Sequence, residues 1–184
     1  LFPLLGRAAD PVPLVYLPFD RDNIVGIGRL DDTAVLPAVS NVQPDGVRRE
    51  CLYIDSDLRL PSAGNFREAE GTVAFWMRAA SQDADTGRSL FCLYGGEHPS
   101  WLHNRWSIWF KGGRVSASLS PSAGGERVTL EAETTVGDGQ WHHIAWTWRG
   151  INSDRNAALV LYVDGVSAVR RADLKLDVGR IGPR

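Results

Sequence analysis

The chain has 184 residues, of which 43% are hydrophobic and 23% are charged, and its formal net charge is −2. This composition is that of an ordinary folded domain, and the lack of a basic surplus argues against nucleic acid as a partner. No apolar run reaches the roughly 18 residues that a spanning helix requires, so no membrane span is predicted.

The sequence begins with Leu1 rather than Met. Residues 1–13 are interpreted as an N-terminal extension or as the end of a processed segment, such as a signal peptide ending near Ala8 and Ala9. Residues 14–184 are predicted to form one domain, because no internal repeat and no linker divides them.

Short apolar runs separated by Gly, Pro, Asp and Ser predict strands joined by turns. The predicted strands are residues 14–18, 51–54, 71–78, 89–94, 105–111, 114–120, 126–133, 142–149 and 158–163, with a weaker candidate at 168–175. Residues 20–49 are expected to form an ordered surface loop, and a short helix is considered only near residues 66–70. The pairs Asp164-Gly165 and Gly112-Gly113 fit two-residue hairpin turns, because Asp and Gly tolerate positive φ.

Alternation along the predicted strands indicates that one side of each strand is buried. Trp106, Ile108 and Phe110 share one face, whereas Trp109 lies on the other. The segment 142–149 alternates in the same way. An all-β sandwich of two sheets is therefore predicted. Cys51 and Cys92 lie in apolar strand-like runs, which is consistent with two buried thiols or with one disulfide.

Three stretches resemble the laminin-G-like family of concanavalin A-like lectin/glucanase jelly rolls. They are residues 14–20 (LVYLPFD), residues 51–77 with CLYID and GTVAFWM, and residues 138–148 (DGQWHHIAWTW) followed by 159–165 (LVLYVDG). The resemblance implies an antiparallel two-sheet jelly roll in an extracellular or cell-surface protein. The family ends with one more strand beside the first, and this sequence stops about where that strand is approached. We interpret this as a missing final strand, the alternative being that another chain covers the edge.

The strongest of these stretches has a structural interpretation. Trp141 is expected to fill the gap between the two sheets. His142 and His143 are adjacent on a strand and point to opposite faces, so they are interpreted as structural residues rather than as a metal-binding pair.

The sequence offers few candidates for catalysis. Laminarinase-type glycosidases share this fold and carry an E-x-D-x-x-E motif on one strand. The nearest pattern here is Glu131-Ala132-Glu133, which lacks the third acid. Carboxylates two apart on a strand could approach the separation of a retaining glycosidase, but strand carboxylates that face water are usually only solvated. The chain is therefore predicted not to be an enzyme.

Calcium is the candidate cofactor. Relatives in the family often bind it near the opening strand, and Asp20 and Asp22 follow the first predicted strand with the oxygen ligands that calcium prefers. The alternative is a solvated turn. Glu97, His98 and His103 share one loop and could bind zinc, although such residues more often form hydrogen bonds at a surface.

The candidate ligand site is an aromatic segment. Indole rings stack on the C–H faces of sugars, and neighbouring polar side chains can bind the hydroxyls. The predicted site residues are Trp101, His103, Asn104, Arg105 and Trp109. The alternative is that the two tryptophans pack under a loop or against another chain.

These observations favour a non-catalytic extracellular recognition module that binds a glycan or a protein on a surface. The alternatives are an assembly domain that associates with other chains in a larger array and, with least support, a glycoside hydrolase. The fold does not decide between them, because it carries many functions.

Overall fold

The computed structural model describes residues 17, 42–47, 50–52, 61–62, 65–80, 87–94, 104–120, 126–153 and 156–178. The chain forms two compact units, Leu1–Asn65 and Phe66–Arg184. In the first unit, β1 (Val42–Gln43) pairs antiparallel with β2 (Cys51–Leu52). β1 lies in the segment that was expected to be a loop, and β2 begins where a strand was predicted. The predicted strand at 14–18 and the predicted boundary at residue 13 lie outside the described residues, apart from Leu17.

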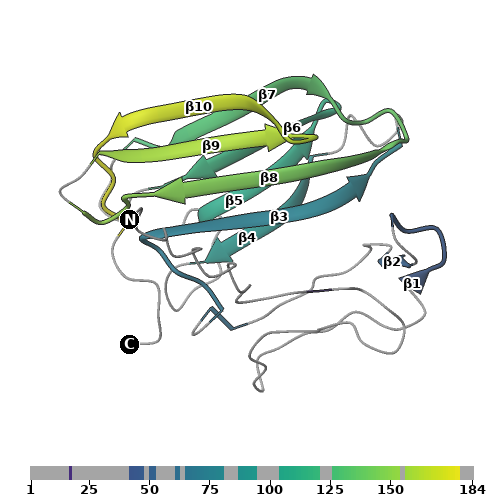
Figure 1. The fold of residues 1–184 in the computed structure, drawn as a ribbon, viewed down its shortest axis with the longest axis horizontal. Helices are drawn as coiled ribbons and strands as arrows, with labels where there is room; N and C mark the ends of the chain where they lie inside the picture. Colours follow the sequence, from purple (N-terminus) through teal and green to yellow (C-terminus); the bar gives the residue numbers. More distant parts are fainter. Residues whose placement is uncertain are drawn as a thin grey trace, which may run out of the picture. The chain divides into compact units, whose positions relative to one another are not determined.

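The second unit contains two antiparallel sheets of four strands each, which confirms the predicted all-β jelly-roll sandwich (Figure 1). One sheet has the order β10-β9-β8-β3, and the other has the order β4-β5-β6-β7. The strands are β3 (Glu70–Arg78), β4 (Arg88–Tyr94), β5 (Asn104–Lys111), β6 (Arg114–Leu119), β7 (Val128–Thr135), β8 (Trp141–Arg149), β9 (Ala157–Val163) and β10 (Val166–Leu174).

The predicted hairpin turns are both present. Gly112 and Gly113 have φ values of 60° and 73° between β5 and β6, and Asp164 and Gly165 have values of 51° and 78° between β9 and β10. Both central residues of each turn are therefore in the left-handed region, as a two-residue hairpin that follows the twist of its strands requires.

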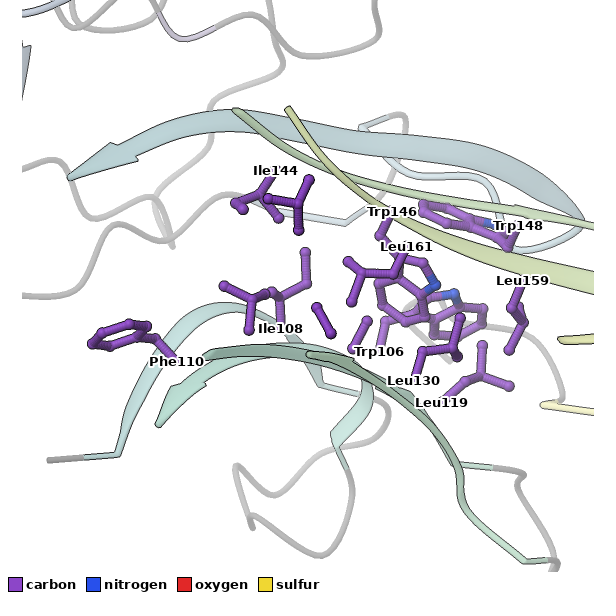
Figure 2. Close-up of a cluster of buried hydrophobic side chains, with 14 of the residues drawn as sticks. Trp106, Ile108, Phe110, Leu119, Leu130, Ile144, Trp146, Trp148, Leu159 and Leu161 are labelled. Atoms are coloured by element: carbon purple, nitrogen blue, oxygen red, sulfur yellow. The ribbon is translucent and has the colours of Figure 1, made fainter. Parts of the chain in front are cut away.

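The core lies between the two sheets, where Figure 2 shows the large side chains meeting. Trp106, Ile108 and Phe110 point inward from β5, and Trp146 and Trp148 point inward from β8; all five are buried. This is the face that the alternation predicts, because residues two apart on a strand share one side of a sheet.

Two expectations from the sequence are wrong, one about a short helix and one about the core. Residues 66–70 form no helix; Phe66 instead stacks on Trp148 at 5.0 Å between ring centroids, and the segment leads directly into β3. Trp141 does not belong to the core, because the register places it opposite Arg78, on the outward face of its sheet. Trp146 and Trp148 fill the space that Trp141 was expected to occupy.

Cys51 lies on β2 in the first unit and Cys92 lies on β4 in the second, and each is half-buried. The disulfide and the pair of buried thiols both stay predictions. In the described part of the chain, no helix has the length and apolar character needed to cross a membrane.

Candidate functional site

The outward face of the β4-β5-β6-β7 sheet carries a row of side chains that spans all four strands. Trp109 on β5 is opposite Ser89 on β4 and Ser116 on β6, and Ser116 is in turn opposite Glu131 on β7. The inward residues of these strands are in the core, so this row points away from it. Trp109 is half-buried, and Ser89 and Glu131 are exposed. We call this surface the Trp109 face.

A second row lies beside the first. Cys92, Ser107, Ser118 and Thr129 are opposite one another in the same strand order. Ser107 and Ser118 are only 1% and 6% exposed, and their Oγ atoms form a hydrogen bond of 2.8 Å. Because each buried hydroxyl has the other as a partner, the pair holds the centre of this face in one arrangement.

A hollow of about 380 Å³ opens at the hairpin end of the Trp109 face. It is lined by Lys111, Gly112, Arg114, Val115, Ser116 and Glu131. Lys111 shares its strand face with Trp109, and Arg114 is opposite Lys111 in the ladder. The hollow therefore continues the row of Trp109, Ser116 and Glu131 toward two cations.

The structure places only part of the predicted ligand site. Trp109 lies on the outward face, as the alternation predicts. Asn104 and Arg105 belong to β5, and their side chains lie outside what the structure describes. Trp101 and His103 also lie outside the described residues, as do Glu97 and His98. The site residues missed from the sequence are Ser89, Lys111, Arg114 and Ser116. The register between strands connects Ser89, Arg114 and Ser116 with this surface, whereas alternation along β5 already places Lys111 on the same side as Trp109.

The structure describes the candidate catalytic residues but not the candidate calcium ligands. Asp20 and Asp22 lie outside the described residues, so calcium binding stays a prediction. Among the residues that are described, no three His, Cys, Asp or Glu side chains group together as metal ligands. Glu131 and Glu133 are both exposed on β7, on either side of the buried Ala132.

The other sheet has an aromatic outward face of its own. Trp76 on β3 is 51% exposed and lies opposite His143 on β8, with 5.1 Å between the ring centroids. Next to this pair, the guanidinium of Arg78 lies 5.1 Å from the ring centroid of Trp141. We call this surface the Trp76 face. Its sequence signal was available, since Trp76 alternates with the inward Phe75 and Met77 and shares a side with Thr72 and Ala74.

His142 is a structural residue, as predicted. Its Nδ1 lies 2.8 Å from Asp164 Oδ2 and its Nε2 lies 3.0 Å from Asp138 Oδ1, so the imidazole joins the turn before β8 to the β9–β10 turn. Partial burial alone would lower the pKa of His142, but the hydrogen bonds to Asp164 and Asp138 outweigh it and raise the pKa above 6.5.

The pKa values of Asp138 and Asp164 shift in the opposite direction, below their ordinary value. A hydrogen bond from the backbone N–H of Gln140, followed by one from His142, lowers the pKa of Asp138 below 3.8. Burial opposes ionisation of Asp164, but hydrogen bonds from His142 and from the His143 backbone outweigh it and lower its pKa. The two carboxylates therefore favour a doubly protonated imidazole between them.

Comparison with known proteins agrees with this architecture. The family model of the Concanavalin A-like lectin/glucanases superfamily matches residues 54–177. The crystal structure of the binding domain of Paraclostridial Mosquitocidal Protein 1 has the same fold, with a TM-score of 0.51 and 17% identity. The likeness covers 77% of this chain and 37% of that chain, so the present sequence spans less than half of the solved structure. No curated protein matches the chain in sequence.

Proposed function

The chain belongs to the concanavalin A-like lectin/glucanase superfamily, and from this premise we propose that it is a non-catalytic module that binds carbohydrate through the Trp109 face. The observation that carries the proposal is the row of Ser89, Trp109, Ser116 and Glu131 beside a hollow of about 380 Å³. Such a row offers a saccharide an aromatic surface for the apolar side of its ring and polar side chains for its hydroxyls.

The chemistry of the row suits a sugar ring. The face of an indole carries partial negative charge and attracts polarised C–H groups, so Trp109 offers a surface for the apolar side of the ring. The hydroxyls of Ser89 and Ser116 donate or accept hydrogen bonds, and the carboxylate of Glu131 accepts them from sugar hydroxyls. A few polar groups placed around an apolar contact are typical of small-molecule sites.

The positions of Glu131 and Glu133 favour binding of a saccharide without its cleavage. A glycosidase general acid must keep its proton near neutral pH, and burial against apolar side chains is the usual way to achieve this. Glu131 and Glu133 are both exposed on β7, so neither lies in the buried, apolar setting that such an acid requires. We therefore assign Glu131 to hydrogen bonding of ligand. A glycan on an extracellular or cell surface is the proposed partner, in keeping with the family.

The test is a glycan-binding panel with wild-type protein and two matched tryptophan variants. Trp109→Ala is expected to abolish binding, and Trp76→Ala, on the other sheet, is expected to retain it. Circular dichroism establishes that both variants are folded. The panel is repeated with a chelator, and loss of binding there would support the predicted calcium site near Asp20 and Asp22. A folded wild-type protein that binds no glycan would overturn the proposal.

A second candidate function is assembly with another protein chain through the Trp76 face. It is favoured by the exposure of Trp76 and by the presence of Trp141 and Arg78 on the same face, since aromatic residues and arginine are enriched at protein interfaces. Light scattering over a range of concentrations tests for self-association. A monomer at every concentration would contradict assembly of this chain with itself, whereas a dimer that Trp76→Ala dissociates would support it.

A further inference from the structure

The hairpin between β5 and β6 places two cations directly opposite each other. Lys111 ends β5 and Arg114 begins β6, and they are register partners across the turn formed by Gly112 and Gly113. Both side chains are exposed and both line the hollow. Like charges directly opposite in an antiparallel ladder repel and destabilise the pairing.

No carboxylate of the described residues neutralises this pair. Glu131 lines the same hollow, yet neither Lys111 nor Arg114 forms an ion pair with it or with any other described side chain. The hollow therefore contains two cationic groups and one anionic group, each without a direct protein counter-charge among the described residues. A local conflict of this kind is expected where a sequence is shaped by a ligand rather than by stability alone.

On the basis of this conflict, and resting on the function proposed above, we propose that the saccharide is anionic and carries a carboxylate or sulfate group that binds between Lys111 and Arg114. The planar guanidinium of Arg114 can donate two parallel hydrogen bonds to such a group, and the ammonium of Lys111 adds a mobile point charge. Their mutual repulsion is relieved when the anion occupies the space between them.

The remaining residues of the hollow fix the orientation of the ligand. Glu131 repels the anionic group and accepts hydrogen bonds from hydroxyls, so it directs the neutral side of the sugar toward β7. Ser116 lies opposite both Trp109 and Glu131 and therefore contacts the middle of the bound ring. The acidic substituent then points to the hairpin, while the ring lies along the row toward Trp109.

The experiment compares three oligosaccharides of equal length by calorimetry: a neutral β-glucan oligomer, an oligogalacturonate and a sulfated glucan oligomer. Wild-type protein is compared with Lys111→Gln, with Arg114→Gln and with the double variant. Arg170→Gln on β10 is the control, because it removes an exposed cation from the other sheet. Each titration is repeated at raised salt, which weakens exposed charge pairs.

We expect at least one acidic oligomer to bind about tenfold or more tightly than the neutral one, since hydrogen bonds between ionised partners are the strong ones. The double variant should lose this preference, and Arg170→Gln should retain it. The apo double variant should remain folded and melt no lower than wild type, because removing like charges relieves repulsion.

The outcomes separate the two proposals. Equal binding of neutral and acidic oligomers, unchanged in the double variant, would overturn the anionic ligand and leave carbohydrate binding intact. Binding of neither class by folded protein would overturn both proposals. A preference for only the carboxylated or only the sulfated oligomer would support the inference and identify the acidic group.

Discussion

Replacing Gly71 with alanine tests how firmly the core is fixed at one edge of the sandwich. Gly71 lies on β3 opposite Trp148, and a Cβ at this position would lie 2.5 Å from Cζ2 of that indole. Carbon atoms in favourable contact are about 3.5 Å apart or more, so the methyl group or the ring must move by about 1 Å.

The ring has little freedom to move. Trp148 is buried, stacks on Phe66, lies 5.7 Å from the ring of Trp146, and donates a hydrogen bond of 3.2 Å from Nε1 to the carbonyl of Arg67. Overpacking a core typically costs about 1–3 kcal/mol, and the smaller entropy of an unfolded alanine chain returns roughly 0.4–1 kcal/mol. The expected net loss is about 1–2 kcal/mol, or roughly 2–8 °C in melting temperature for a domain of this size.

Urea denaturation followed by tryptophan fluorescence measures the change, and Gly87→Ala provides the matched control. A Cβ at Gly87 would meet only Cδ and Cγ of Lys111, at 3.7 and 3.9 Å, which are ordinary contacts. That variant should be as stable as wild type or slightly more stable. Equal unfolding midpoints for the two alanine variants would show that Trp148 is not held over Gly71 and would refute the packing argument.

Two further predictions concern hydrogen bonds. Ser118→Ala leaves the buried Ser107 hydroxyl without its partner and should cost about 1–2 kcal/mol in urea denaturation, whereas the double change to alanine should recover part of this loss; a double variant that is simply additive would contradict the pairing. His142 stabilises the fold through its raised pKa, so this contribution is complete below about pH 6.5 and is lost as the pH rises through the folded-state pKa. The aspartates have lowered pKa values, so their contribution is present above about pH 3.8 and is lost on acidification. Thermal melts should therefore show wild-type stability falling from pH 6 to pH 9, and His142→Gln should lose that dependence; identical pH profiles would exclude the role given to this histidine.

The sequence predicts the strands well where one face is apolar without interruption. Trp106, Ile108 and Phe110 alternate with Ser107 and Trp109, so both the strand and the side that each residue occupies were readable in advance. β7 begins two residues later than predicted, because Glu126 and Arg127 precede its apolar alternation without contributing to it. Trp141 was misassigned because its size suggested burial, whereas its strand phase placed it with the outward His143.

The candidate site could not be predicted from the sequence because it depends on which residues of different strands lie opposite one another. The row of Ser89, Trp109, Ser116 and Glu131 depends on the register between strands, and that register shifts at an irregularity after Ser89 and at another after Arg114. An extra residue on one strand moves every later side chain relative to its neighbour. The contacts of His142 likewise join turns that are distant in sequence, so its pKa could not be read from its own surroundings along the chain.

The strand order also has a consequence for how this unit folds. β8, β9 and β10 form successive hairpins, and β4 to β7 form a second run of neighbours, but β3 reaches β8 only across the whole inserted β4–β7 sheet. Closing such a long connection costs more chain entropy than closing a hairpin, so docking of β3 is expected to be late and slow. Until it occurs, the edge of β8 presents unpaired backbone groups that a second nascent molecule can occupy. Refolding yield should therefore fall with protein concentration even where the finished domain is stable.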